Sequence, residues 1–471
     1  MTLRPLIACC AALLSACATN PTAGDRRTSV DLVVEGDYVL TMNGDEMIAS
    51  GAVAISAGEI VAVGKAADIA KRYSSTQTIS GEQTVVMPGL VNGHTHAAMS
   101  LLRGIADDLE LMQWLQDYIF PAEVRFVDEE FVRIGTELAC WEMIRGGTTT
   151  FVDLYYFPDA VAEAVERCGL RAIVAPTVID QKSPDAENGA QSLAQAAEFA
   201  RRWKDRNPRI IPAIAAHSVY TLPTEWVRKV RDAAFEIGVP TTIHLSESPF
   251  ETQVIREQHD STSTELLERL DFFDNPVIAA HVVWPSDSDK QKLAQHGVGV
   301  IHNPTSNMKL ASGVSPVSSM LAAGVKVGLG TDGAASNNDL DMWEEIRLAT
   351  FLAKVSEMDP TALPARRALS LATAEGAAAI GLGDQVGQLA PGMRADLIQV
   401  SLADLSFVPI YGVISHLAYV ADEHDVTTVI VDGRILMRNR EVLSINKYRL
   451  RREAGELTAR IRAELVTGQD R

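Results

Sequence analysis

The sequence predicts an α/β protein: a closed (β/α)8 barrel of the TIM type with a small, discontinuous β-sandwich domain built from both terminal regions. Three observations predict this class. Eight short apolar runs alternate with amphipathic helical segments from Thr84 onward, and runs of β type occupy both ends of the chain. No Gly-rich loop of the GxxxxGK[ST] type is present to indicate an open nucleotide-binding sheet. A chain of 471 residues is long enough for a barrel with a second domain.

The first seventeen residues (1–17) predict an export signal that is not part of the fold. An early positive charge precedes an apolar stretch over residues 6–14, and small residues follow. The letters LSAC at 14–17 resemble the lipobox of bacterial lipoproteins, so we expect cleavage before Cys17 and a lipid on it. Residues 18–28 are polar, as in a flexible tether.

This N-terminus predicts an exported protein, anchored by lipid to a bacterial membrane and facing the periplasm or the exterior. Two alternatives remain open. The signal is cleaved without lipidation, or the start site is wrong and the protein is cytoplasmic.

The two β-rich ends flank the barrel. Residues 29–84 contain the runs DLVVEGDYVLTMNG and GAVAISAGEIVAVG, and residues 389–445 contain further short runs of β type. The pair Asp432-Gly433 is a strong hairpin signal. We therefore expect both ends to join in one small sheet or sandwich. Residues 446–471 predict a charged terminal helix.

The barrel itself is expected over residues 85–388. Its apolar runs are continuous, as in parallel strands buried on both faces. The segments between them have helical spacing, and segments such as EEFVRIGTELACWEMIRGG end in Gly, as a helix C-cap requires. The strand candidates are TVVMPGLVNG, TTTFVDL, RAIVAPTVID, RIIPAIAAHS, VPTTIHLSE, PVIAAHVVW, VGVIHNP and VKVGLGTDG.

Composition and charge exclude some classes of function. The chain has 47% hydrophobic and 22% charged residues, which is typical of a globular protein. A formal net charge of −19 repels a phosphate backbone, and no Lys/Arg cluster opposes it, so we expect no nucleic-acid partner. Cys140 and Cys168 are interpreted as small buried apolar side chains rather than a disulfide. No CxxC motif supports a thiolate metal site. A homo-oligomer is left open.

Polar residues concentrate where the predicted strands end. His94 and His96 end the first strand, and their spacing of two places both on one face, toward the barrel mouth. A lone histidine at a strand end is more often a hydrogen-bonded surface or core residue. The whole set, however, combines imidazoles with carboxylates, which is the ligand chemistry that suits zinc. The partner positions at the other strand ends are His217, His244, Glu247, His281 and Asp332.

These residues resemble the amidohydrolase superfamily, and most closely its 5′-methylthioadenosine/S-adenosylhomocysteine deaminases, which are grouped with the triazine hydrolases (the ATZ/TRZ family). The resemblance covers roughly residues 30–440 and implies a (β/α)8 barrel with a β-sandwich formed by both termini. The stretches that carry it are MPGLVNGHTHAAMSLLRGIADDL, HSVYT, IHLSE, IAAH, HNPTSNMKLASG and LGTDGAASNN.

The resemblance implies a metal-dependent aminohydrolase that converts an adenine nucleoside to its inosine analogue and ammonia. Its metal ligands would be His94, His96, His244 and Asp332. One divalent ion, most plausibly Zn²⁺, is implied, because two-metal members bridge their ions with a lysine after strand 4, and RIIPAIAAHSVYTL has none. The resemblance implies that Asp332 and His281 accept the proton of the attacking water, and that Glu247 acts as acid and base at the purine ring.

The substrate residues implied by the resemblance are His217, which would donate a hydrogen bond to the purine, and Glu123, which would contact the ribose hydroxyls. Glu123 could instead cap a helix, and Trp114 either lines the pocket or only packs. The family members that take S-adenosylhomocysteine place arginines after strand 3, where this chain has Pro176 and no arginine. Methylthioadenosine or adenosine is therefore favoured, although Lys182 could partly substitute.

Two other function classes are weighed. The same metal site could act on another heterocycle, such as guanine, a pterin or a triazine, since only the pocket would differ. A non-catalytic solute-binding lipoprotein is the other reading, but it predicts decay of the catalytic set, and no member of that set is missing.

Overall fold

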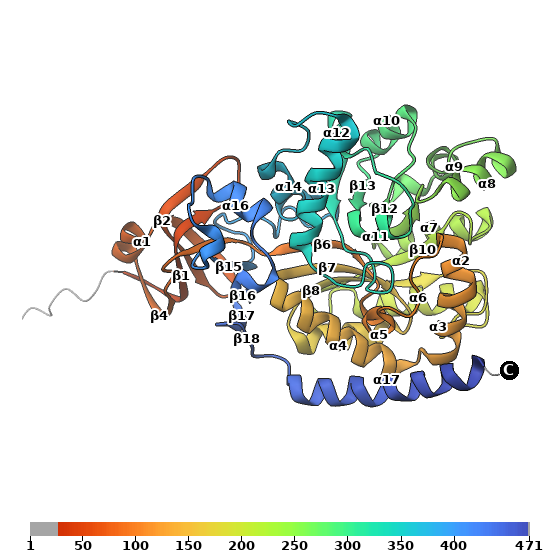
Figure 1. Cartoon of the computed structure of the whole chain (residues 1–471), viewed down its shortest axis with the longest axis horizontal. Coiled ribbons are helices and arrows are strands. Elements are labelled where there is room, and N and C mark those ends of the chain that lie inside the picture. Colours follow the sequence, from red (N-terminus) through yellow and green to blue (C-terminus); the bar gives the residue numbers. More distant parts are fainter. Residues whose placement is uncertain (1–26, 470–471) are drawn as a thin grey trace, which may run out of the picture.

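The computed structural model describes residues 27–469. The predicted signal, the lipidation site at Cys17 and most of the expected tether lie outside the described residues. A β-rich domain lies beside a larger barrel surrounded by helices, and the long terminal helix runs along one side of the barrel (Figure 1). Within residues 27–469, no helix combines the length and the apolar character needed to cross a membrane.

The barrel contains all eight predicted strands, in sequence order and with parallel neighbours, plus a short β9 (Ile210–Pro212) that pairs with β8. The prediction of a TIM-type barrel is confirmed. Its strands are β6 (Leu90–Thr95), β7 (Thr148–Tyr155), β8 (Arg171–Val178), β10 (Ile214–Ser218), β11 (Thr241–Leu245), β12 (Val277–His281), β13 (Gly299–His302) and β14 (Lys326–Leu329).

Hydrogen bonds at the carboxyl ends of β14 and β6 close the barrel. The Asp332 N–H donates to the His94 carbonyl at 2.9 Å. The Asn92 side chain donates to Thr331 Oγ1 at 2.7 Å and accepts from the Thr331 N–H at 3.0 Å. The first and last strands therefore meet at the residues that the sequence assigned to a metal site.

Helices cover the outside of the barrel. The ends of α4 are set by capping residues. Asp128 accepts a hydrogen bond from the Phe131 N–H at 2.8 Å where the helix begins, and Gly147 ends the helix in a left-handed conformation. The segments after the strands are η1 (Ala97–Leu102), α2 (Leu111–Gln113), η2 (Trp114–Ile119), α3 (Phe120–Phe126), α4 (Glu129–Gly146), α5 (Pro158–Cys168), α6 (Gly189–Trp203), α7 (Thr224–Ile237), α8 (Pro249–His259), α9 (Ser263–Arg269), η3 (Phe272–Asp274), α10 (Asp287–Gln295), α11 (Pro304–Lys309), α12 (Val317–Ala322), α13 (Met342–Glu357), α14 (Ala365–Leu371) and α15 (Ala374–Ala379).

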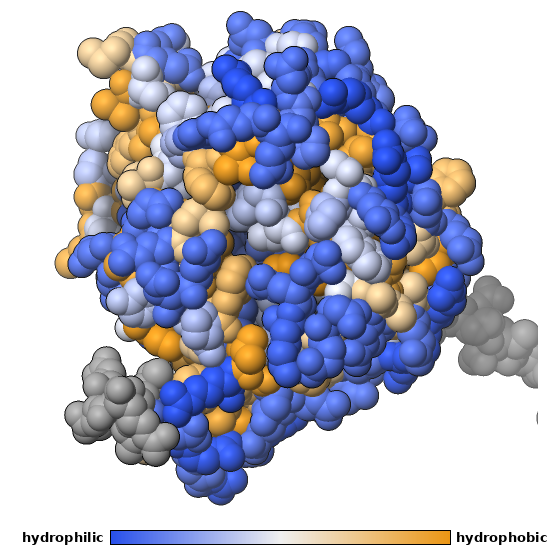
Figure 2. Space-filling view, turned by 90° about the vertical axis from the view of Figure 1, so that its right-hand side faces the viewer, coloured by the Kyte–Doolittle hydropathy of each residue, from blue (hydrophilic) through white to orange (hydrophobic). Residues whose placement is uncertain are grey.

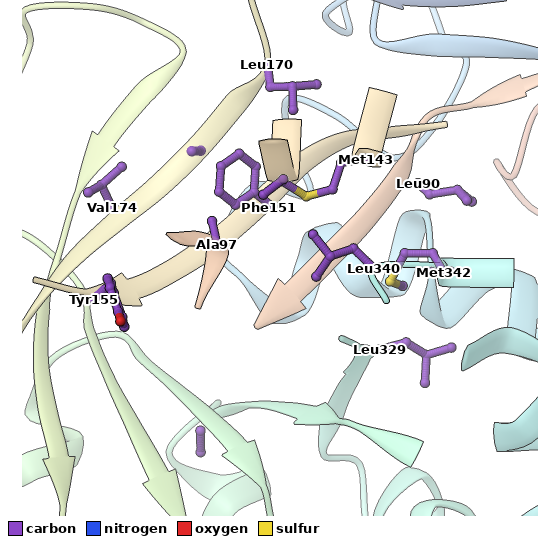
Figure 3. Close-up of a cluster of buried hydrophobic side chains, with 14 of the residues drawn as sticks. Leu90, Ala97, Met143, Phe151, Tyr155, Leu170, Val174, Leu329, Leu340 and Met342 are labelled. Atoms are coloured by element: carbon purple, nitrogen blue, oxygen red, sulfur yellow. The ribbon is translucent and has the colours of Figure 1, made fainter. Parts of the chain in front are cut away.

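Alternate residues of the strands fill two separate cores. Val152 of β7 packs inside the barrel with side chains of the other strands and of α15. Its neighbour Phe151 points the other way and joins the layer between strands and helices, which also contains Met143 of α4 (Figure 3). Cys140 and Cys168 are free, buried thiols in this outer layer, as their interpretation as small apolar side chains expects.

The two terminal regions form a separate nine-stranded mixed sheet, so the expected pairing of both ends is confirmed. Hydrogen bonds join its strands into one sheet, in which β5 pairs with β1 in parallel and with β15 antiparallel. Its elements are β1 (Thr28–Leu40), β2 (Met47–Ser56), β3 (Glu59–Lys65), α1 (Ala66–Arg72), β4 (Tyr73–Ile79), β5 (Thr84–Pro88), β15 (Leu397–Ser401), η4 (Leu405–Phe407), α16 (Val413–Tyr419), η5 (Glu423–Asp425), β16 (Val426–Val431), β17 (Arg434–Arg438) and β18 (Glu441–Val442).

The boundary expected at residue 85 needs a correction. The run TVVMPGLVNG is not one barrel strand, because Thr84–Pro88 belongs to the terminal sheet as β5 and the barrel begins at Leu90. The chain crosses between the domains at Gly89. A Cβ there would lie only 2.1 Å from the Thr149 side chain, so the crossing is too tight for any other residue.

A buried ion pair links the barrel to the terminal sheet, and an exposed one links the terminal helix to the barrel. Arg171 of β8 forms two hydrogen bonds with Asp396 beside β15, at 2.8 and 3.2 Å, and both side chains are 1% exposed. The terminal helix α17 (Lys447–Gln469) lies against α4, where Arg460 pairs with Glu130 at 2.7 Å.

Candidate active site

Side chains from the carboxyl ends of five strands meet at the barrel mouth. They come from β6, β10, β11 and β12 and from the turns after β11 and β14, and all but His96 are buried. The face that carries α2, α3 and α8 shows a hollow near its centre, bordered by hydrophobic and hydrophilic side chains (Figure 2). The residues brought together are His94, His96, His217, His244, Glu247, His281 and Asp332.

The four predicted metal ligands lie within coordinating reach of one ion. Asp332 Oδ1 lies 3.3 Å from His94 Nε2 and 3.2 Å from His96 Nε2. His244 Nε2 lies 3.3 Å from His96 Nε2. The His94, His96 and His244 donor atoms all lie within 4.8 Å of one another, as do those of His94, His281 and Asp332.

Two of these atoms lack any other partner, which is the test of fit for a metal. His94 Nε2 and Asp332 Oδ1 are buried and have no hydrogen-bond partner among the described residues. Buried polar atoms in native proteins are normally satisfied, so two unpaired ligand atoms that lie close together fit a cation-binding site. Three imidazoles and a carboxylate are a typical zinc donor set.

The second ring nitrogens of His96 and His244 are held by backbone carbonyls, whereas Nδ1 of His94 has no hydrogen-bond partner among the described residues. His96 Nδ1 bonds the Leu154 carbonyl at 2.5 Å, and His244 Nδ1 bonds the His217 carbonyl at 2.7 Å. A proton on Nδ1 in each ring leaves the Nε2 lone pair free for a metal. Every residue has a backbone carbonyl, so the sequence could not show which ones orient the histidines.

Asp332 is oriented in the same way. The hydroxyls of Ser306 and Ser336 donate to its Oδ2 at 2.7 and 2.8 Å, which leaves Oδ1 facing the histidines. Burial alone would raise the pKa of Asp332, but the contacts with His94 and His96 lower it well below its usual value. The carboxylate is therefore ionised, as a metal ligand must be.

The pKa values of the histidines bear on metal binding as well. Burial lowers the pKa of His94 to about 4, and burial also holds the pKa of His244 well below its usual value. Burial opposes charge on His96 as well, but its contact with Asp332 raises the pKa to about 9. A bound cation would displace that proton, so metal binding is expected to compete with protonation of His96.

Glu247 and His281 lie beside the metal ligands. Glu247 Oε1 lies 3.9 Å from His281 Nε2, and burial raises the pKa of Glu247 to about 7. His281 Nδ1, when protonated, donates to Asn307 Oδ1 at 3.0 Å, and the Asn303 amide nitrogen lies 3.2 Å from the same ring atom. Both asparagines lie in the stretch HNPTSNMKLASG, but their contact with a histidine of the preceding strand could not be inferred from the sequence.

Glu251 fixes the turn that carries Glu247, and sequence reasoning missed it. It is fully buried, and its two carboxylate oxygens accept from the N–H groups of Ser246 at 2.8 Å and Glu247 at 3.0 Å. Ser246 has a φ of 49°, in the left-handed region, so this turn is strained and the carboxylate holds it.

The substrate residues expected from the sequence line the same cavity. Glu123 accepts from the Tyr156 hydroxyl at 3.4 Å, and burial raises its pKa to about 7. Burial lowers the pKa of His217 to about 3, so its ring is neutral, and its Nδ1 lies 2.9 Å from Thr221 Oγ1. Trp114 is buried and forms part of the cavity wall.

Comparison with known proteins gives the family. The amidohydrolase family model matches residues 85–436 of the chain. This protein belongs to the amidohydrolase family. As an amidohydrolase, it is 44% identical over 437 residues to a 5′-deoxyadenosine deaminase of Methanosarcina mazei, with 92% of this chain and 99% of the relative covered.

Other similar proteins and solved structures point to the same family. A 5-methylthioadenosine/S-adenosylhomocysteine deaminase of Desulforudis audaxviator is 44% identical over 436 residues, covering 92% of this amidohydrolase and 100% of that protein. A solved structure of an adenosine deaminase from Xanthomonas campestris with bound zinc has 39% identity and a TM-score of 0.90, covering 93% of this chain and 100% of that one. A triazine hydrolase of 22% identity shares the fold, with a TM-score of 0.83. The amidohydrolase described here is therefore a metal-dependent enzyme with a site for one divalent ion.

Proposed function

We propose that this amidohydrolase deaminates an adenine nucleoside, either adenosine or 5′-methylthioadenosine, to the inosine analogue and ammonia. The observation that carries the proposal is that one cavity joins a metal-ligand set, a buried carboxyl with a pKa of about 7 at Glu247 and a second buried carboxyl at Glu123. Relatives that are 44% identical and named for deamination of adenine nucleosides support it.

The chemistry divides between the ion and the chain. A divalent metal at this site supplies a nucleophile at neutral pH because it lowers the pKa of a water molecule to roughly 7. Glu247, partly protonated near neutral pH, donates a proton to N1 of the purine as negative charge develops there. His281 Nε2 lies between Glu247 and the metal ligands, where it accepts the proton of the nucleophile together with Asp332. The proton held by His281 and Asp332 then passes to the C6 amino group, which leaves as ammonia, and the proton of the new C6 hydroxyl returns to Glu247 as the carbonyl forms.

The substrate is held from two sides. His217 is neutral, and its ring lies 4.9 Å from the His244 ring, so it can hydrogen-bond the purine above the metal ligands. Glu123 lies on α3, and as a carboxylate it can accept from both ribose hydroxyls at once. Tyr156 donates to the same carboxylate and fixes its orientation.

The 5′ end of the nucleoside is expected to be uncharged. Among the described residues that line the cavity, none is a lysine or an arginine. Pro176 ends the pairing of β7 with β8 where the deaminases that take S-adenosylhomocysteine place arginines. Lys182 lies outside the cavity and pairs with Glu187 at 3.0 Å. A carboxylate tail would find no bidentate partner, which disfavours S-adenosylhomocysteine.

A substrate panel tests the proposal. Ammonia release is measured on metal-loaded enzyme with adenosine, 5′-methylthioadenosine, S-adenosylhomocysteine, guanine and a pterin. We expect turnover of the first two at the highest kcat/KM. If only guanine or the pterin reacts, the nucleoside assignment is wrong and the site serves another heterocycle.

The N-terminal expectation stays a proposal of its own. We propose that the signal over residues 1–17 exports the enzyme and that Cys17 carries a lipid. Labelling with a radioactive fatty acid, followed by membrane fractionation, should place the wild-type protein in the membrane fraction with label. A Cys17→Ser variant should lose the label, and unlabelled wild-type protein in the cytoplasm would contradict the proposal.

A further inference from the structure

Exposed apolar side chains gather on one surface where the two domains meet. Seventeen large apolar side chains are exposed among the described residues, and seven of these lie on α13 and its C-cap, on η4, or in the turn from η4 to α16. Helix α16 of the terminal domain lies beside α13 and α14 of the barrel (Figure 1). We call this surface the junction patch, and its seven side chains are Phe351, Val355, Met358, Leu405, Val408, Ile410 and Tyr411.

Helix α16 joins the two halves of the junction patch. The Tyr419 ring stacks on Phe351 of α13, with the ring centroids 5.6 Å apart and the planes 9° apart. One turn earlier in α16, His416 stacks on Phe407 of η4, and its Nε2 lies 3.1 Å from the Pro409 carbonyl oxygen. Residues three positions apart lie on the same side of a helix, so the η4 segment and α13 adjoin the same side of α16. The junction patch is therefore one continuous surface that spans both domains.

The junction patch is strongly exposed, and its projecting segment is uncharged. Tyr411 is 94% exposed, and Leu405 and Met358 are each 85% exposed. Residues 405–411 contain no charged side chain, although the chain as a whole has a net charge of −19. Single exposed apolar residues are ordinary, but a contiguous apolar patch of this size marks a surface that another molecule covers.

A second copy of the chain fits the junction patch better than a membrane does. At the roughly 150–250 Å² that a large side chain can bury, the exposed fractions of the seven side chains amount to on the order of 800 Å². A standard dimer interface takes about 800 Å² from each partner. A surface that docks on a bilayer is typically bordered by Lys and Arg, whereas the exposed residues Glu357, Asp359 and Asp404 border this one. Lys354 is already bonded to the carbonyls of Pro360 and Ala362.

We infer that two copies of this chain dimerise through the junction patch about a two-fold axis. Such an interface uses the same surface on both partners, so each patch residue contributes twice. Two copies with a net charge of −19 each repel one another, and the apolar contact must overcome this repulsion. Salt screens the repulsion, so the association should tighten as the salt concentration rises. None of the patch residues lines the catalytic cavity, so the inference is independent of the proposed function.

Sedimentation equilibrium of the metal-loaded full chain measures the dissociation constant of the dimer. Every protein compared carries Cys17→Ser, so that no lipid contributes to association. Tyr411→Asp and Val355→Asp each place a charge in one half of the patch. Each should raise the dissociation constant about 100-fold or more, because an apolar contact is lost on both partners and two like charges face the interface. Phe235→Asp is the matched control, since Phe235 on α7 is 66% exposed against 65% for Val355 and lies outside the patch. It should leave the constant unchanged.

The outcomes separate the possible occupants of the junction patch. A wild-type chain that stays monomeric at its highest soluble concentration overturns the inference. So does a dimer that either Tyr411→Asp or Val355→Asp leaves intact, or one that weakens as salt is added. Circular dichroism and metal content check that each variant is folded. Flotation with vesicles of phosphatidylethanolamine and phosphatidylglycerol tests the membrane: a monomer that binds them and loses binding in Tyr411→Asp would assign the patch to lipid instead.

Discussion

Replacing Glu251 with glutamine should disable the enzyme although Glu251 does not line the catalytic cavity. Its carboxylate accepts from the N–H groups of Ser246 and Glu247 at 2.8 and 3.0 Å, and it is fully buried. Glutamine preserves the shape but turns one acceptor into a donor. One of the two N–H groups would then face an NH2 group with no water to replace the lost bond.

The magnitude follows from that single lost acceptor. A buried donor left unsatisfied costs about 1–3 kcal/mol, so the free energy of unfolding should fall by this amount. The turn at Ser246 is strained and would relax, moving the Glu247 carboxyl from its position near His281. A shift of about 1 Å at a catalytic group lowers kcat about 100-fold, and we expect a loss of about 10- to 100-fold with little change in KM.

The assay measures kcat, KM and zinc content for Glu251→Gln, Glu247→Gln and the double variant. If Glu251 acts only by positioning Glu247, its substitution should have almost no further effect on kcat once Glu247 is glutamine. Asp289→Asn is the matched control: Asp289 is also fully buried and accepts from the Ser286 N–H at 2.8 Å, but it caps α10 outside the cavity. It should lower stability and leave kcat near the wild-type value. Multiplicative losses in the double variant, or loss of zinc in Glu251→Gln, would refute the positioning role.

The other predictions concern the metal, the proton donor and the domain junction. Chelation should abolish deamination and lower Tm, and zinc at about 100 times its Kd should return about 2.7 kcal/mol of stability; activity that survives metal removal would exclude the proposed nucleophile. Glu247→Gln should lower kcat about 100-fold with normal metal content. Because burial raises the pKa of Glu247 to about 7, the donor loses its proton as pH rises, so kcat should fall above pH of about 7 in the wild type but not in Glu247→Gln. Asp396→Ala removes the nearer carboxylate of the buried Arg171 charge and leaves it only Asp432, at 3.6 Å. This change should cost up to about 3–5 kcal/mol in urea unfolding while kcat of the folded enzyme stays near the wild-type value.

The sequence predicted the barrel because parallel strands buried on both faces are continuous apolar runs, and all eight were visible. The sequence did not reveal that one of these apolar runs contains the boundary between the terminal sheet and the barrel. Thr84–Pro88 and Leu90–Thr95 are equally apolar, yet they pair with different sheets. Only Gly89 between them marks the crossing, and its meaning depends on Thr149, which lies 60 positions away in the chain and 2.1 Å away in space from a Cβ at this position.

For the site, the sequence could place residues of distinctive chemistry but not the atoms that hold them. His94, His96, His244 and Asp332 stood out because imidazoles and a carboxylate recurred at strand ends. The Leu154 carbonyl that orients His96 belongs to a residue 58 positions away, and any residue there would offer the same oxygen. Glu251 was hidden for another reason, since a carboxylate four residues after Glu247 is indistinguishable from a helix-surface residue until its burial is known.

Two of the metal ligands also take part in closing the barrel. His94 supplies a ring nitrogen to the site and a backbone carbonyl to the Asp332 N–H, at 2.9 Å, where β14 meets β6. Asp332 adopts a φ of 64°, which a β-strand could not continue, so the strand must end as its carboxylate turns toward the histidines. The last strand therefore cannot dock on the first without bringing the carboxylate to within 3.3 Å of His94 Nε2. Closure of the barrel therefore brings His94 and Asp332 together, and an ion held by both would link the first and last strands as well as serve the chemistry.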